Sequence, residues 1–134
     1  MDVYLASSFN LIPLVEDAYR KLTEAGHIIP VRWWDRIELK RKFAPLSADI
    51  FYAEPECQYA YLRDRSAIEA CQAIILISGD SPYKFAGASY EMGLADAMGK
   101  LLYSVGEIEN SAMYYAIRRF KSIENVIDDL KEVQ

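Results

Sequence analysis

The chain has 134 residues, of which 52% are apolar and 26% are charged, a composition that excludes a disordered chain and predicts one domain with its own core. The net charge of −5 argues against nucleic acid or an anionic membrane as the main partner. Two cysteines and one histidine supply neither a disulfide framework nor a set of metal ligands, so we expect no metal and no cofactor.

Strand-like and helix-like segments alternate along the chain. In order, we expect a strand over 3–7, a helix over 13–26, a strand over 27–34, an irregular segment over 35–53, a helix over 54–71, a strand over 73–78, a loop over 79–87, a helix over 87–98, a strand over 101–106, a helical turn and a short strand within 111–120, and a helix over 122–133. Pro13 and Pro55 suit first helical turns, and Ser122 suits an N-cap. Pro30 places the second strand near an edge of the sheet.

This alternation predicts an α/β fold: a single domain over 1–134, built as a doubly wound parallel sheet of about five strands of the Rossmann or flavodoxin-like kind, with helices on both faces. In such folds ligands bind at the carboxyl ends of the strands. Three loops share that edge, over 7–11, 79–87 and 106–112. The first residues, MDVYLAS, contain no basic region or long apolar run, so we expect a cytoplasmic protein.

The helix over 87–98 carries a carboxylate on its apolar stripe. Leu94, Ala95 and Met98 form the stripe, and helical spacing places Glu91 on the same face near the helix start. A start that faces a cleft explains the acid. A position in the first turn lowers a carboxyl pKa, so we expect Glu91 to be ionised.

The preceding helix repeats the pattern. Asp64 falls within an apolar stripe that includes Tyr61, Ala67 and Ile68. One such acid is often a salt-bridged or capping residue, but two acids on helices that flank one strand indicate a site. Asp64 lies in mid-helix, where burial raises a carboxyl pKa, and it is the better proton carrier of the two. Paired carboxylates with divided roles suit cleavage at an anomeric carbon.

Three segments resemble the nucleoside 2-deoxyribosyltransferase superfamily: "YLASSF", "RDRSAIEACQAIILI" and "GASYEMGLADAMGK". The resemblance spans about residues 3–120, and its strongest motif is the third segment. It implies that Glu91 is the nucleophile, that Asp64 assists it and the proton transfer, and that Tyr4 lies at the sugar. It also implies that Ser111, in "SAM", enters the site of a neighbouring subunit, as in the 2′-deoxynucleoside 5′-monophosphate N-glycosidases of this group.

The chain departs from the superfamily at positions that read the substrate. The resemblance implies an arginine in the first loop for the 5′-phosphate, where this chain has Asn10. It implies a serine in the N-glycosidases, or an acid in the transferases, at the position of Phe85; Asp80 is a candidate replacement for the acid. Gln72 stands where an aspartate is usual. The sequence therefore leaves open whether the substrate is phosphorylated.

Other residues at the same edge of the sheet each have two possible roles, one in substrate binding and one in the structure. Trp33 or Trp34 can stack on a nucleobase or pack on the sheet. Asp35 is a turn residue or a base reader, and the serines of the first loop are sugar contacts or helix caps. The full set of candidate substrate-binding residues is Ser7, Ser8, Phe9, Asn10, Trp33, Asp35, Gly87, Ser89, Asn110 and Ser111.

Two functions of different class follow. The first is an enzyme that cleaves the N-glycosidic bond of a nucleoside or nucleoside monophosphate through Glu91 and passes the sugar to another base or to water. The second is a nucleotide-binding or sensing module without turnover. Because Met113, Tyr114 and Tyr115 cannot all face one core, we expect a homodimer with shared active sites. The alternative is that they cover one end of the sheet.

Overall fold

The computed structural model describes residues 1–36, 53–79, 85–108 and 111–133. In these ranges four parallel strands form one sheet, β1 (Val3–Ala6), β2 (Ala73–Gly79), β3 (Leu101–Gly106) and β4 (Arg118–Phe120), in the order β1-β2-β3-β4. The register pairs Tyr4 with Ile74, and Ile74 with Leu102. The predicted α/β sheet is confirmed, with four strands instead of about five.

The prediction of a strand over 27–34 was wrong. In this segment only Ile28 forms a parallel bridge, with Asp2, and the chain then turns into the 3-10 helix η2 (Trp33–Arg36). Pro30 has no backbone N–H, so the ladder cannot continue past the bridge. The bridge lies on the side of β1 away from β2, where a doubly wound fold places its second strand.

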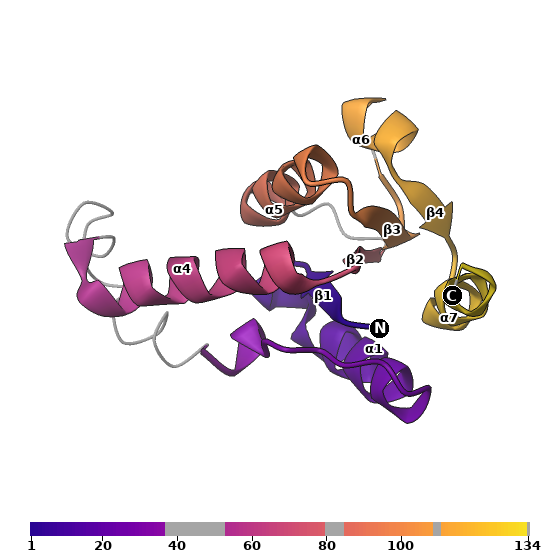
Figure 1. The fold of residues 1–134 in the computed structure, drawn as a ribbon, viewed down its shortest axis with the longest axis horizontal. Coiled ribbons are helices and arrows are strands. Elements are labelled where there is room, and N and C mark those ends of the chain that lie inside the picture. The colour runs from indigo at the N-terminus through magenta and orange to yellow at the C-terminus, as the bar shows by residue number, and fades with distance from the viewer. Residues whose placement is uncertain (37–52, 80–84, 109–110, 134) are drawn as a thin grey trace.

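Helices cover both faces of the sheet (Figure 1). α1 (Ile12–Glu24) packs with α7 (Ile123–Glu132) on one face, and α4 (Pro55–Ala70) packs with α5 (Ala86–Ala97) on the other. The short η1 (Phe9–Leu11) precedes α1, and α6 (Ser111–Ala116) joins β3 to β4. This arrangement confirms the predicted doubly wound fold, with the site-bearing helices α4 and α5 side by side.

Local sequence signals mark several of these elements. Ser122 caps α7, since its hydroxyl accepts a hydrogen bond from the Asn125 N–H at 3.2 Å. Pro13 and Pro55 lie in the first turns of α1 and α4, as predicted. In the residues that the structure describes, no helix is both long and apolar enough to cross a bilayer.

The core runs along the neighbouring strands β1 and β2. Every residue of β1 is buried, and so are the first six residues of β2. At the carboxyl ends of β2 and β3 the backbone of Gly106 approaches Gly79 so closely that a Cβ on Gly106 would lie 2.4 Å from the Gly79 nitrogen. Gly106 also has a φ of +108°, which favours glycine. This close approach ties the two strand ends together next to the loops expected to hold a ligand.

Candidate active site

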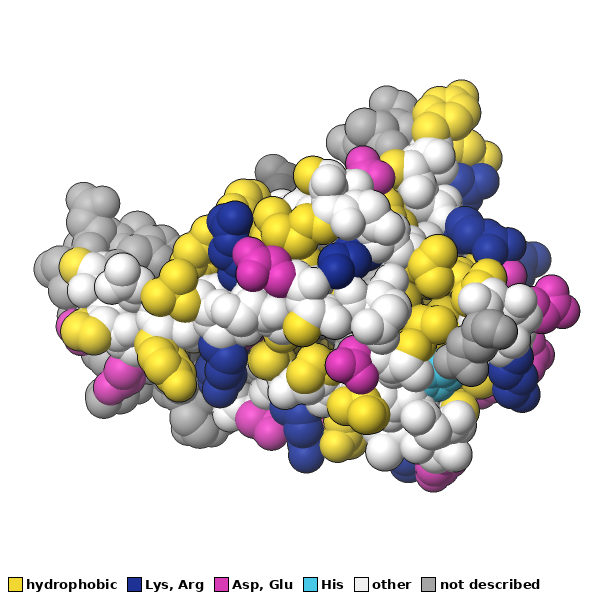
Figure 2. Space-filling model, in the orientation of Figure 1, with side chains coloured by type: hydrophobic (Ala, Val, Ile, Leu, Met, Phe, Trp, Pro, Cys, Tyr) yellow, Lys and Arg dark blue, Asp and Glu magenta, His cyan; other side chains and the backbone are white. Residues whose placement is uncertain are grey.

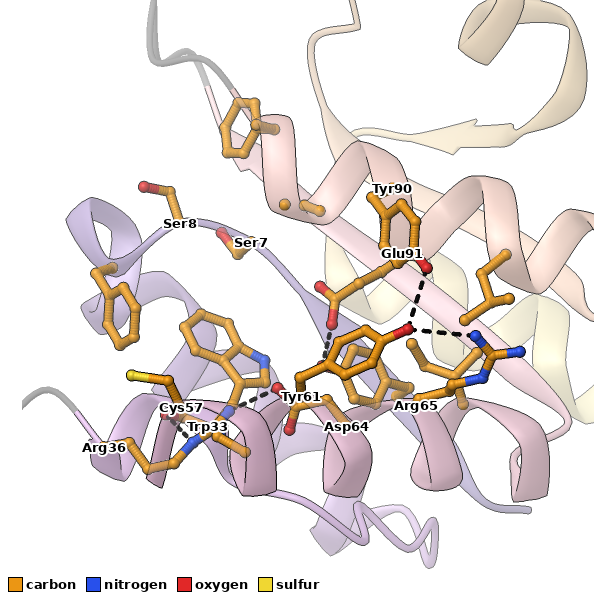
Figure 3. Close-up of a pocket in the computed structure, with 18 of the residues that line it drawn as sticks. Ser7, Ser8, Trp33, Arg36, Cys57, Tyr61, Asp64, Arg65, Tyr90 and Glu91 are labelled. Atoms are coloured by element: carbon orange, nitrogen blue, oxygen red, sulfur yellow. Dashed lines mark hydrogen bonds and ion pairs between the residues drawn. The ribbon is translucent and has the colours of Figure 1, made fainter. Parts of the chain in front are cut away.

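A cavity of about 1000 Å³ opens between α4 and α5 at the carboxyl end of β1 (Figure 3). It lies at the edge of the sheet where the fold predicts ligand binding. The described residues that line it are Tyr4, Ser7, Ser8, Phe9, Trp33, Arg36, Ala53, Cys57, Gln58, Ala60, Tyr61, Asp64, Arg65, Ile68, Phe85, Gly87, Ala88, Tyr90, Glu91 and Leu94. Three predicted catalytic residues, Tyr4, Asp64 and Glu91, thus share one cavity.

Tyr4 and Glu91 meet at the inner wall of this cavity. Tyr4 is 1% exposed and projects from β1 toward the face covered by α4 and α5. Its hydroxyl donates a hydrogen bond to Oε2 of Glu91. Burial, together with the negative charge of Glu91, raises the pKa of Tyr4 above its ordinary value, so Tyr4 keeps its proton and remains a donor.

The expectation that Glu91 stays fully ionised was wrong. Burial raises the pKa of Glu91 to about 7; the Tyr4 hydrogen bond opposes this rise and the charge of Asp64 adds to it. α5 begins at Ala86, so Glu91 lies in its second turn, beyond the free backbone amides that would lower its pKa. Glu91 therefore changes its charge near neutral pH.

Asp64 forms an ion pair with Arg36 in the same cavity. Arg36 Nη2 lies 2.6 Å from Asp64 Oδ2, and the exposed side-chain fractions are 21% and 19%. Burial raises the pKa of Asp64, and Arg36 opposes that rise. Asp64 Oδ1 is buried and has no hydrogen-bond partner among the described residues. A buried acceptor of this kind can receive a donor from a bound molecule.

Arg36 is a site residue that the sequence reasoning missed. The 3-10 turn of η2 places it, since Trp33 Nε1 donates to the Leu5 carbonyl at 2.5 Å and so anchors η2 to β1. Arg36 Nε donates to the Trp33 carbonyl at 3.3 Å, which aims the guanidinium at α4. The one signal in the sequence was a cation directly after the two tryptophans and Asp35.

Two tyrosines and an arginine form the outer wall (Figure 3). The hydroxyls of Tyr61, on α4, and Tyr90, on α5, lie 3.4 Å apart, and either one can be the donor. Arg65 Nη1 donates to the Tyr61 hydroxyl at 3.3 Å. Hydrogen bonds from Tyr90 and then Arg65 lower the pKa of Tyr61. These contacts connect the two helices across the cavity.

Several predicted binding residues line the cavity in structural roles. Ser7 Oγ donates to the Ile77 carbonyl at 2.6 Å, and Ser8 caps η1. Phe9 packs edge-on against Trp33, with ring centroids 5.3 Å apart. Trp33 is buried, and its indole N–H donates a hydrogen bond to the Leu5 carbonyl of β1. Gly87 borders the cavity in the first turn of α5, where no side chain narrows it.

Other predicted binding residues lie away from the cavity lining. Asn10 is exposed and donates to Ser8 Oγ at 3.3 Å. Asp35 pairs with Arg32, with 3.4 Å between Nε and Oδ2. Ser89 donates to the Met113 sulfur at 3.6 Å and so contacts α6. Asp80, Asn110 and the side chain of Ser111 fall outside the described residues. Within the described ranges, no three His, Cys, Asp or Glu side chains converge as metal ligands would.

The chain was compared with known families, curated proteins and solved structures. No family model matches it, and no curated protein matches its sequence. Among solved structures it is similar to the 2-deoxyribosyltransferase of the psychrotolerant bacterium Bacillus psychrosaccharolyticus, with a TM-score of 0.72 over 96% of this chain and 91% of that one, at 21% identity. The protein therefore has the fold of a 2-deoxyribosyltransferase, with two acids in the cavity between α4 and α5.

Proposed function

We propose that the protein is a member of the nucleoside 2-deoxyribosyltransferase superfamily and cleaves the N-glycosidic bond of a nucleoside or nucleoside monophosphate. The observation that carries this proposal is Glu91: a partly buried carboxylate that lines an open cavity and accepts a hydrogen bond from Tyr4. The fold it shares with a deoxyribosyltransferase supports the same reaction class. A buried acid costs desolvation energy, and a catalytic role explains why the site contains one.

The reaction has two displacements. In the first, a Glu91 oxygen attacks C1′ of the sugar, the C1′–N bond breaks, and its electron pair leaves with the base, which takes up a proton. A glycosyl ester on Glu91 results. In the second, water or the nitrogen of another base attacks C1′, and Glu91 leaves as a carboxylate. Two inversions return the original configuration at C1′, as in retaining glycosidases.

Tyr4 and Asp64 assist these steps. Tyr4 holds one oxygen of Glu91, which fixes the rotamer and favours the ionised form that attacks. Asp64 lines the same cavity, and its Oδ1 has no partner among the described residues, so this oxygen can exchange a proton with the base: it donates one to the leaving base and, once ionised, accepts one from the incoming nucleophile. The division of labour is nucleophile on α5 and proton carrier on α4.

We also propose that the active protein is a homodimer with shared sites. Tyr115 is 87% exposed and Tyr114 is 44% exposed on α6, and hydrophobic side chains gather at the α6 end of the face in Figure 2. Exposed aromatic residues of this kind are typical of protein interfaces. In such a dimer the segment that contains Asn110 and Ser111 reaches a substrate beside the partner's nucleophile.

The test is a panel of nucleosides and their 5′-monophosphates, incubated with the protein with and without a second free base, followed by chromatography of the bases and nucleosides. Release of a free base without an acceptor identifies a hydrolase. A new nucleoside formed with the acceptor identifies a transferase. Binding to several members of the panel with no product at all would contradict the enzyme and favour a nucleotide-binding module.

A further inference from the structure

We propose that Arg36 is a positioning residue of this site: it holds Asp64 by one oxygen, presents the other oxygen to the substrate, and supplies the positive charge that lets two neighbouring carboxylates function together. The inference rests on the proposed function, and it concerns a residue outside the three segments that resemble the superfamily. It follows from the contacts of the Arg36 guanidinium.

The first step is geometric. Arg36 Nη2 donates a hydrogen bond to Asp64 Oδ2 at 2.6 Å, while Oδ1 of the same carboxylate is buried without a partner in the described part of the chain. One oxygen of Asp64 is thus fixed and the other remains as the acceptor for a substrate hydroxyl or N–H. Without Arg36, both oxygens would be equivalent and the carboxylate could rotate.

The second step concerns rigidity. Arg36 is itself held by the Trp33 carbonyl, and Trp33 is held by the Leu5 carbonyl on β1, the strand that carries Tyr4. A chain of hydrogen bonds therefore connects β1 to α4 through η2. Tyr4 fixes Glu91 from the same strand. Both acids are therefore positioned by hydrogen bonds that lead to the same strand, β1. A shared rigid support keeps two reacting groups at a fixed distance and orientation.

The third step is electrostatic. Among the described residues, the charged and titratable groups that act on Glu91 are Tyr4 from β1, Asp64 from α4 and Arg36 from η2. Arg63, on α4, also acts on Asp64. Of these, Arg36 is the cation that lowers the pKa of both acids. Two close carboxylates resist ionising together, and a nearby cation that acts on both reduces that cost. Arg36 thereby keeps the nucleophile available near neutral pH.

The experiment compares the pH dependence of kcat/KM for base release in the wild type, Arg36→Gln and Arg36→Lys. Loss of the cation should move the acid limb of kcat/KM in Arg36→Gln to higher pH by about one unit. The loss of kcat/KM relative to the wild type should therefore be about tenfold larger below neutral pH than above it. Arg36→Lys should restore the position of the limb but keep a reduced kcat, because an ammonium lacks the planar fork. Arg32→Gln is the matched control, since Arg32 also pairs with an aspartate and lies off the cavity lining.

A double-mutant cycle separates positioning from simple structural loss. If Arg36 acts through Asp64, then Asp64→Asn should add little to the effect of Arg36→Gln. Equal loss of rate at every pH together with fully additive effects would overturn the proposal.

A second measurement is independent of turnover. The carboxyl of Glu91, identified by the signal lost in Glu91→Gln, can be titrated by carbon-13 NMR. Its pKa should rise in Arg36→Gln and not in Arg32→Gln. An unchanged pKa would overturn the electrostatic part of the inference. If the wild type releases no base from any nucleoside, the proposed reaction fails, and this titration still decides the role of Arg36.

Discussion

The Tyr4 hydroxyl donates a hydrogen bond to Glu91 Oε2, joining the first strand of the sheet to a helix 87 residues later in the chain. Both residues line the same cavity, and burial raises the pKa of each. The pair combines a donor that does not ionise with a carboxylate that titrates near pH 7. Several measurable consequences depend on this relationship.

Replacing Glu91 by Gln should abolish base release, with a loss of about 10³-fold or more, because the amide cannot form the glycosyl ester. The fold should persist, since Gln keeps an acceptor for Tyr4. Incubation of the wild type with a 2-fluoro sugar analogue, followed by peptide mass analysis, should add the sugar mass to a peptide containing Glu91. Near-normal turnover in Glu91→Gln would exclude Glu91 as the nucleophile.

Replacing Tyr4 by Phe should raise the pKa of Glu91, because the lost hydrogen bond is the one that lowers it. The acid limb of kcat/KM should therefore move to higher pH, with the largest loss of rate below neutral pH. Tyr103→Phe is the matched control: Tyr103 is also a buried strand tyrosine that donates to a carboxylate, Asp129 Oδ2 at 2.8 Å, away from the cavity lining. A shifted limb in Tyr103→Phe as well would point to a general effect on stability.

Replacing Asp64 by Asn should lower kcat more than it changes KM, by about 10²-fold, because the proton carrier is lost while the shape of the side chain is kept. Rapid-quench measurement of the first turnover should show that formation of the glycosyl ester is slowed. If kcat stays at the wild-type value, Asp64 serves only as the structural partner of Arg36.

Folding stability should depend on pH through Glu91. Its pKa is about 7 in the folded protein, against 4.5 for an ordinary glutamate, so the folded state binds more protons between these values. Stability therefore falls as pH rises across this window, by about 3 kcal/mol from this group. Glu91→Gln removes the titration, so the variant should be more stable than the wild type at about pH 8 and as stable as the wild type near pH 4.5. Urea unfolding at several pH values measures the difference, and a constant difference would contradict the raised pKa.

The proposed shared sites predict complementation. Glu91→Ala should be inactive, and so should a variant with Asn110→Ala and Ser111→Ala. Mixing the two under conditions that exchange subunits should restore part of the activity, because each mixed dimer contains one site with all of its residues. A protein that is monomeric by light scattering at assay concentration, yet fully active, would exclude this arrangement.

Local signals in the sequence were enough to predict several of the helices and strands. The continuous apolar run of β2 predicted a strand buried on both faces, and Ser122 predicted the start of α7, because periodicity and capping depend on residues a few positions apart. The same periodicity placed Glu91 and Asp64 on the apolar stripes of their helices, and both are partly buried. Periodicity alone identified these two acids, and the resemblance to a known superfamily added Tyr4, which lines the same cavity.

Other features depend on contacts between residues far apart in the sequence and could be seen only in the folded chain. The segment over 27–34 has the composition of a strand, yet Pro30 ends the ladder and Trp33 is held instead by the Leu5 carbonyl. That turn brings Arg36 to Asp64, 28 positions away, and no local pattern indicates such a pair. The pKa of Glu91 likewise depends on how completely the fold removes water from its carboxyl, a quantity fixed by packing around the side chain and not by its neighbours in the sequence.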